Sequence, residues 1–197
     1  TDADFNVAVG YHALSSDTKG SRSTAIGQGA LFTQNFTSAT DTYKTAVGYA
    51  AGVNVTTGQY NTFIGGLAGD ANTTASNNTS VGYNSLSANT TAAENAAFGS
   101  NAASAVTEGT KNTALGAYAL RNDTLGSFST AVGHQALNAQ NFTSATSAYN
   151  TAVGANAGVS VSTGIRNTYI GALAGDGTTT GSNNVAVGFD ALSSNTV

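Results

Sequence analysis

One glycine recurs through the whole chain at an almost fixed spacing. Most intervals between these glycines are 17 residues, and two are 21 residues. A short fixed period means that the chain is built from one stacking unit, which favours a solenoid over a globular fold with a single active site. The recurring glycines are Gly10, Gly27, Gly48, Gly65, Gly82, Gly99, Gly116, Gly133, Gly154, Gly171 and Gly188.

The residues just before each glycine predict a short β-strand. Counting the glycine as position 0, position −3 is mostly Thr and position −1 is always large and apolar. This alternation has a period of two, and β-branched residues favour strands. We expect position −1 to be buried as the core column of the fold. That predicted core column is Val9, Ile26, Val47, Ile64, Val81, Phe98, Leu115, Val132, Val153, Ile170 and Val187.

Two further columns predict how the units stack. Position −4 is mostly Asn, and in-register stacking would let these side chains bond one another in an amide ladder. Position +3 is Ala in every unit except Ser85, and we expect this column to contact a neighbouring chain. Helices are excluded because a Gly in each helix interior would cost about 1 kcal/mol. The predicted fold is therefore all-β, a parallel β-solenoid (β-roll) of about eleven 17-residue coils, which we expect to be trimeric.

A longer repeat is superimposed on the short one. The hexapeptide Asn-Phe-Thr-Ser-Ala-Thr occurs at 35–40 and again at 141–146, and residues 1–91 match 107–197 without gaps. We treat residues 1–197 as a single solenoid domain that contains this 106-residue super-repeat. The four extra residues of each 21-residue unit predict a loop, and loops on repeat proteins often line a binding face.

These loops supply the candidate surface-contact residues. Phe36 and Phe142 are expected at the loop tips, although each side chain could instead fold back over the edge of its coil. The candidate contact residues are Asn35, Phe36, Thr37, Asn141, Phe142 and Thr143.

Composition excludes several functions. Only 8% of the residues are charged and the net charge is −4, so nucleic-acid binding is not expected. The chain has no Cys, which excludes disulfides and thiolate metal sites. No apolar run is long enough to span a membrane in this segment. The serines lack a Gly-x-Ser-x-Gly context, and His12 and His134 lie far apart in sequence. We predict no catalytic, cofactor-binding or metal residues, no cofactor and no enzyme activity.

Several phrases carry a family resemblance. Asn-Thr-Ala-Val-Gly-x-x-Ala-Gly at 150–158 and Thr-Thr-Gly at 56–58 resemble the head repeats of YadA-like trimeric autotransporter adhesins. They resemble still more the related repeats of bacteriophage tail fibres and large bacterial surface proteins. The resemblance covers essentially the whole chain, although the adhesin unit is shorter than 17 residues. It implies a left-handed parallel β-roll wound with two sister chains into a trimer.

The expected function follows from the period, the composition and the resemblance together. We expect a non-enzymatic segment of a longer extracellular fibre, on a virion or a bacterial cell surface, that presents or contributes to attachment to host glycans or proteins. Its expected partners are two further copies and other fibre or virion domains. A second possible function is that of a subunit in a self-assembling filament joined through open coil ends.

An ice-binding solenoid and a carbohydrate-processing β-helix enzyme are disfavoured. The ice-binding solenoid would need a second Thr beside the Thr column, and that Thr is missing. The enzyme would need clustered acidic residues, and the ten acidic residues of the chain are scattered.

Overall fold

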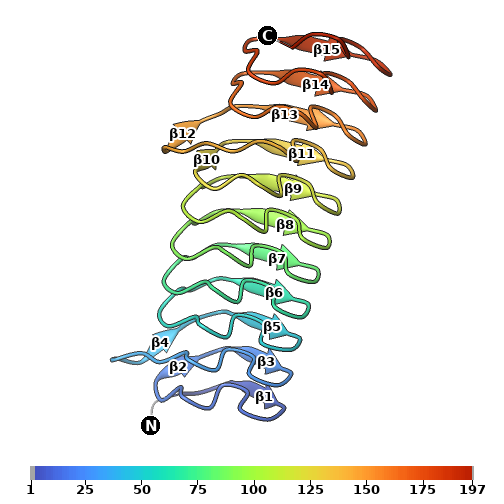
Figure 1. Cartoon of the computed structure of the whole chain (residues 1–197). Coiled ribbons are helices and arrows are strands. Elements are labelled where there is room, and N and C mark those ends of the chain that lie inside the picture. The colour runs from blue at the N-terminus through green and yellow to red at the C-terminus, as the bar shows by residue number, and fades with distance from the viewer. Residues whose placement is uncertain (1–2, 197) are drawn as a thin grey trace.

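The computed structural model describes residues 3–196 and is a parallel β-solenoid without helices (Figure 1). Eleven three-residue strands form one sheet in which the strand order follows the chain. Every pair is parallel and in register, so each column of the repeat becomes a straight row. The strands are β1 (Val7–Val9), β3 (Thr24–Ile26), β5 (Thr45–Val47), β6 (Thr62–Ile64), β7 (Thr79–Val81), β8 (Ala96–Phe98), β9 (Thr113–Leu115), β11 (Thr130–Val132), β13 (Thr151–Val153), β14 (Thr168–Ile170) and β15 (Val185–Val187). The predicted solenoid of about eleven coils is confirmed.

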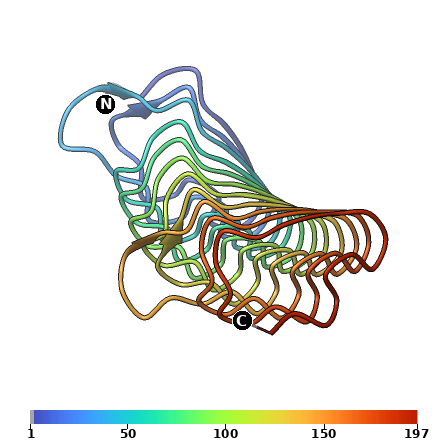
Figure 2. The same cartoon turned by 90° about the horizontal axis from the view of Figure 1, so that it is seen from above.

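Two small parallel sheets accompany the 21-residue coils. β2 (Gly20–Ser21) pairs with β4 (Thr40–Asp41), and β10 (Gly126–Ser127) pairs with β12 (Thr146–Ser147). Viewed as in Figure 2, successive coils are rotated relative to one another, so the stack is twisted. The two longer segments project from the side of the coil opposite the turn that follows the main sheet.

The prediction that position −1 forms the core is wrong. The strand alternation is present, but its phase places position −2 inside and position −1 outside. Ala25, Ala46 and Phe63 at position −2 are fully buried, whereas Ile64 and Leu115 at position −1 are 38% and 47% exposed. The inner space of a 17-residue coil is narrow, so mostly small side chains fit where the strand faces the opposite wall. The larger β-branched residues are therefore directed outward.

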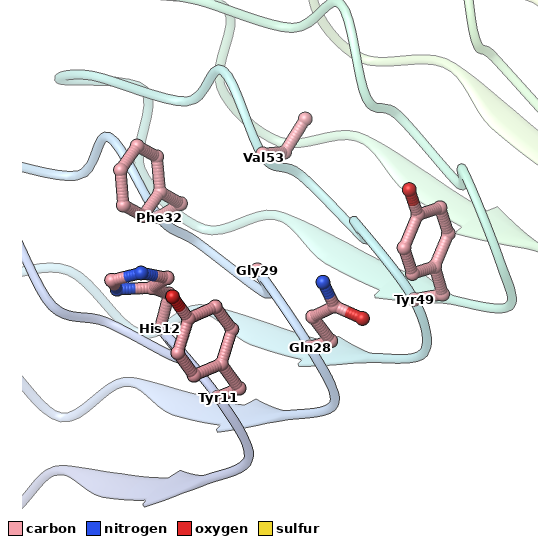
Figure 3. Close-up of a pocket in the computed structure, with 7 residues that line it drawn as sticks. All are labelled: Tyr11, His12, Gln28, Gly29, Phe32, Tyr49 and Val53. Carbon is pink, nitrogen blue, oxygen red and sulfur yellow. The ribbon is translucent and has the colours of Figure 1, made fainter.

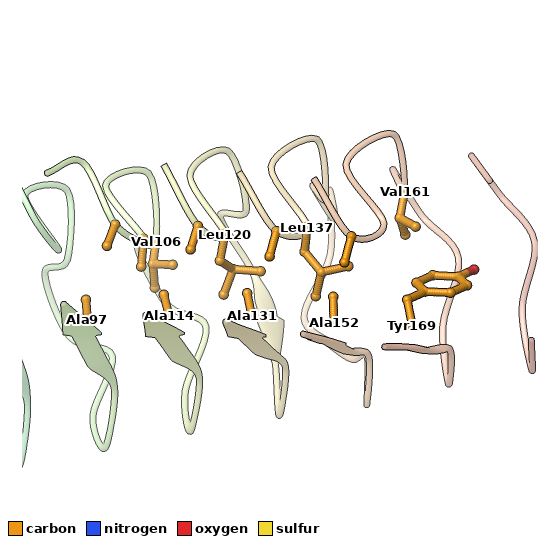
Figure 4. Packing of buried hydrophobic residues seen from close by; sticks show 14 of the residues in the cluster. Ala97, Val106, Ala114, Leu120, Ala131, Leu137, Ala152, Val161 and Tyr169 are labelled. Carbon is orange, nitrogen blue, oxygen red and sulfur yellow. The ribbon is translucent and has the colours of Figure 1, made fainter. Parts of the chain in front are cut away.

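The core consists of stacked small residues with a few large ones between them (Figure 4). Ala at position −2 packs near Ala at position +3 and Leu at position +4, and the +3 alanines are fully buried in nine successive coils apart from Ser85, which is itself buried. The expected contact of the +3 column with a neighbouring chain is therefore wrong, because the column lies inside its own coil. Ser replaces Ala at position +3 of this coil because the Ser85 hydroxyl is hydrogen-bonded to that of Ser80 at 2.5 Å. The two buried polar groups thus satisfy each other.

The repeat glycines mark a close approach of two backbones. Gly65 has a φ of +132°, and a Cβ atom added there would lie 2.5 Å from the carbonyl oxygen of Gly82 in the next coil. A side chain would thus clash with main chain that cannot move independently. The period seen in the sequence is the spacing of these contacts between coils.

The Asn column links neighbouring coils through hydrogen bonds between side chain and main chain, not between one side chain and the next. The Asn95 amide nitrogen donates to the carbonyl of Gly109 at 2.9 Å, and its Oδ1 accepts the backbone N–H of Asn112 at 2.9 Å. Every Asn of the column before Asn184 makes the same two bonds, so each closes its own coil and holds the start of the next strand. The predicted amide ladder is corrected to a ladder of side chain to main chain bonds, which satisfy buried backbone groups.

Three columns have left-handed backbone at non-glycine residues, at positions −5, +2 and +4. Leu31, Leu120 and Leu137 at position +4 have φ near +50°. Each such residue costs roughly 1–2 kcal/mol relative to the right-handed form. Because the same conformation recurs in every coil, only the ladders between coils can offset it, and a single coil is not expected to fold alone.

Candidate interaction surface

The outer face of the main sheet carries one apolar side chain in every coil. Position −1 supplies this row, which we call the outer apolar column. Its exposure in the isolated chain ranges from half-buried Val47 and Val132 to Val187 at 67%. Its members are Val9, Ile26, Val47, Ile64, Val81, Phe98, Leu115, Val132, Val153, Ile170 and Val187.

The neighbouring column on the same face is uncharged and is Thr in all coils except those of Val7, Ala96 and Val185. Thr24, Thr62 and Thr151 at position −3 are half-buried, and no charged residue occupies position −3 or −1 in any coil. In-register pairing makes the two columns straight and parallel. The face is therefore long, uniform and neutral. All-parallel sheets occur almost only with both faces covered, and within residues 3–196 nothing packs on this one.

The two insertion loops direct their Phe side chains toward the coil rather than toward solvent. Phe36 and Phe142 are 8% and 5% exposed, so both rings fold back over the coil edge. Of the two alternatives left open by the sequence, the structure therefore has the rings folded back and not at exposed loop tips, because an aromatic ring gains more from covering the core than from facing water. The ring of Phe36 covers the Lys44 ammonium, whose nitrogen lies 4.8 Å from the ring centre.

The polar loop residues are exposed and partly held by the coil before them. The Thr18 hydroxyl donates to Asn35 Oδ1 at 3.0 Å, and Thr124 makes the matching bond to Asn141 Oδ1 at 2.9 Å. Thr37 and Thr143 are exposed. Asn35 and Thr37 in the first loop, and Asn141 and Thr143 in the second, therefore lie on the surface. The two loops are separated by the six coils of the super-repeat.

A cluster of charged and aromatic side chains borders the first loop. Arg22 lies between the rings of Phe5 and Tyr43, 5.0 and 5.6 Å from their centres, and pairs with Asp41 at 3.0 Å. The Tyr43 ring is stacked on Tyr60. The Asp41 carboxylate raises the pKa of Arg22. In the second copy, Phe128 and Tyr149, which correspond to Arg22 and Tyr43, are stacked on each other. The row of aromatic and charged side chains was not predicted from the sequence, although Phe5, Arg22, Tyr43 and Tyr60 all stand at position −5.

A buried polar cluster repeats in the two halves with one difference. Gln34 Nε2 donates to Asp17 Oδ2 at 2.7 Å and to Ser23 Oγ at 3.0 Å, and Gln140 makes the matching bonds to Asp123 and Ser129. Burial raises the pKa of Asp123. In the second copy Asn150 completes the cluster by donating to Gln140 Oε1 at 2.8 Å.

In the first copy, Lys44 stands where Asn150 stands in the second. The Lys44 side chain is buried, and its ammonium has no hydrogen-bond partner among the described residues. Burial lowers the pKa of Lys44 to about 7, partly offset by the charge of Asp17.

An aromatic pocket of about 230 Å³ lies on the turn that follows the strands of the first three coils (Figure 3). Tyr11 and Tyr49 lie on either side of Gln28, and His12 stands edge-on to Phe32, with ring centres 5.5 Å apart. The signal for this pocket in the sequence is Tyr at position +1 of the first, third and fifth coils, although position +1 is not uniform along the chain.

Two features are absent from the described part of the chain: a cluster of metal-binding side chains and a helix that could span a membrane. Residues 3–196 contain no group of three or more His, Asp or Glu side chains that could hold a metal ion. Across the same residues, no helix has the length and apolar character needed to cross a membrane. No protein-family model, curated protein or solved structure matches this chain.

Proposed function

We propose that this chain is a structural and adhesive segment of a trimeric extracellular fibre, either a phage tail fibre or a bacterial surface adhesin. In this proposal, three copies pack through the outer apolar column and the assembled rod contributes to attachment to host glycans or proteins. The observation that carries the proposal is the uncovered apolar face of an eleven-stranded parallel sheet.

The length and uniformity of the face support association along the whole rod. Eleven coils at about 4.8 Å each extend roughly 50 Å, and every coil contributes one large apolar side chain. A contiguous exposed apolar strip of this length is typical of a protein interface rather than of a monomer surface. The number of three chains and the extracellular setting rest on the resemblance to trimeric fibre repeats.

Light scattering after size exclusion tests the assembly. The wild-type chain at micromolar concentration should have about three times the monomer mass of 19.4 kDa. Ile64→Glu with Leu115→Glu should give monomers, because two charges would be buried against apolar partners. Thr74→Glu with Thr91→Glu adds the same charge at exposed positions away from the sheet and should leave the trimer intact. A wild-type monomer would refute the proposal.

The self-assembling filament is the second candidate, favoured by the outward edges of β1 and β15. These two strands have only one neighbour each in the sheet. Negative-stain microscopy of the purified chain would show rods of indefinite length in that case, and rods of uniform length for a closed trimer. The same samples can be assayed for thermal hysteresis, which an ice-binding solenoid would produce.

A further inference from the structure

Three exposed tyrosines form a row beside the main sheet. One coil without a tyrosine lies between each neighbouring pair. Position +1 carries Tyr11, Tyr49 and Tyr83 in the first, third and fifth coils, with side chains between 59% and 70% exposed. The intervening coils carry Gln28 and Gly66 at this position. Neighbouring tyrosines are thus two coil steps apart, or about 9.6 Å.

The first gap of this row is a formed pocket. Tyr11, Gln28 and Tyr49 line it together with His12, Phe32 and Val53. The Tyr11 and His12 rings are in edge contact, with centres 3.9 Å apart, and His12 is in turn held against Phe32. The wall around Tyr11 is therefore built from mutually packed rings (Figure 3).

The dimensions and chemistry of the gap fit a sugar ring. Gln28 lies between Tyr11 and Tyr49, which are two coil steps apart, so a sugar ring that rests on one tyrosine is within reach of the Gln28 amide. The negative faces of the tyrosines attract the C–H groups of a pyranose. Gln28 offers an amide that both donates and accepts hydrogen bonds to hydroxyls. No charged side chain lines the pocket, so a neutral sugar fits better than an acidic one.

The duplicated half of the chain shows that these aromatics are not needed for the fold. Shifted by 106 residues, Tyr11 and Tyr49 correspond to Ala117 and Ala155, and Phe32 corresponds to Asn138. The strands of the second half have the same lengths and register. The glycine, inner Ala and Leu positions are retained while the pocket residues differ, so the repeat does not require the tyrosines.

We propose that the pocket binds a neutral hexopyranose against the rings of Tyr11 and Tyr49, with Gln28 hydrogen-bonded to its hydroxyls. This inference rests on the proposed function in one respect, since it gives the attachment segment a glycan as its ligand. It moves the binding site from the insertion loops to the aromatic pocket. Tyr83 extends the row, so an oligosaccharide can continue along the rod.

Saturation-transfer NMR and calorimetry with simple glycosides test the pocket. The probes are the methyl glycosides of glucose, galactose, mannose and N-acetylglucosamine, with methyl glucuronide as the acidic comparison. At least one neutral probe should bind saturably, with a roughly millimolar dissociation constant for a ligand of this size. Tyr11→Ala and Tyr49→Ala should each weaken binding at least tenfold. Tyr60→Ala, at an exposed tyrosine outside the pocket, should bind as the wild type does.

A gain of binding provides the converse test. Ala117→Tyr with His134→Gln and Ala155→Tyr rebuilds the row in the second half, and it should restore binding in a chain that also carries Tyr11→Ala. Thermal unfolding of each variant establishes that it is folded. The proposal is overturned if the folded wild type binds none of the neutral probes, prefers the glucuronide, or keeps its affinity in the Tyr11→Ala and Tyr49→Ala chains.

Light scattering on the same samples separates this inference from the fibre proposal. A trimer that binds no neutral sugar refutes the pocket and leaves the fibre proposal standing. A monomer that binds sugar through Tyr11 supports the pocket and refutes the trimer.

Discussion

Phe63 and Gly69 share a volume that an Ala and a Leu share in other coils, such as Ala114 and Leu120. A Cβ atom at Gly69 would collide with the Phe63 ring, and one at Gly52 in the preceding coil would lie 2.8 Å from its Cδ2. One aromatic ring thus fills the space of two leucines. Tyr169 relates to Gly158 and Gly175 in the same way, so the packing solution was duplicated with the super-repeat.

This shared volume predicts strong coupling between the two positions. Phe63→Ala should cost about 3–5 kcal/mol because it leaves a cavity. Gly69→Leu should destabilise the wild type by overpacking, yet it should recover part of the loss in the Phe63→Ala chain, since Leu fills the vacated space. A double-mutant cycle from urea unfolding measures the coupling. Equal effects of Gly69→Leu in both chains would contradict the shared volume.

The Tyr169 hydroxyl is buried without a hydrogen-bond partner among the described residues. Its counterpart in the first half, Phe63, has no hydroxyl in the same environment. Tyr169→Phe should therefore raise the free energy of unfolding by about 1–2 kcal/mol, because an unsatisfied polar group is removed. Phe63→Tyr should have the opposite effect. Thermal unfolding of both variants checks the pair, and a loss of stability in Tyr169→Phe would show that the hydroxyl is satisfied.

A comparison of Gly65 with Gly188 distinguishes the cost of backbone strain from the cost of a clash between coils. Both have φ near +130°, but a Cβ at Gly188 would meet only Ala191, at 3.9 Å, whereas one at Gly65 would clash with Gly82. Gly188→Ala should cost about 1–3 kcal/mol from the backbone conformation alone. Gly65→Ala should cost clearly more, since two coils must separate locally. The urea midpoint followed by circular dichroism compares them, and equal costs would remove the steric explanation of the glycine period.

Asn95 and Asn184 belong to the same column but differ in the hydrogen bonds that they make, so their replacement can be compared. Asn95→Ala leaves the N–H of Asn112 and the carbonyl of Gly109 without their partners, which should cost about 2–4 kcal/mol. Asn184 accepts no bond from a following strand in residues 3–196, and its amide nitrogen is unpaired there. Asn184→Ala should thus cost well under half as much. Amide hydrogen exchange at Asn112 gives a local readout, and unchanged protection there would rule out the ladder bond.

Lys44 predicts a pH dependence of stability. Burial lowers the pKa of its ammonium to about 7 from 10.5, so the unfolded chain binds more protons than the folded chain between these values. Stability should therefore rise with pH from 7 to about 10.5, and the full penalty for burying the charge should be present below pH 7. Lys44→Asn, which copies Asn150, should be more stable than the wild type by roughly 3–5 kcal/mol below pH 7.

The contribution of Lys44 is found from the difference in stability between the Lys44→Asn variant and the wild type at each pH. The advantage of Lys44→Asn should shrink as the pH rises from 7 to 10, as measured by thermal unfolding at each pH. Lys111→Asn removes an exposed lysine, so its difference from the wild type should stay nearly constant. A constant difference for Lys44→Asn as well would mean that Lys44 is solvated in the folded chain.

The sequence by itself determined the period, the strand positions and the register, because a glycine between two close backbones tolerates no substitute and must recur with every coil. It also located the two insertions and the super-repeat. It did not determine which side of the strand faces inward. Positions −2 and −1 are both apolar in most coils, as with Ala46 and Val47, and alternation alone does not choose between them.

The tertiary structure decided the phase, since the narrow interior of a 17-residue coil fits Ala better than Ile or Val. It also decided that Phe36 and Phe142 are buried and that Lys44 loses its solvent. These outcomes depend on space left by residues far apart in sequence, which no column of the repeat records. The pocket lined by Tyr11 and Tyr49 has the same origin, because only stacking brings residues of three coils together.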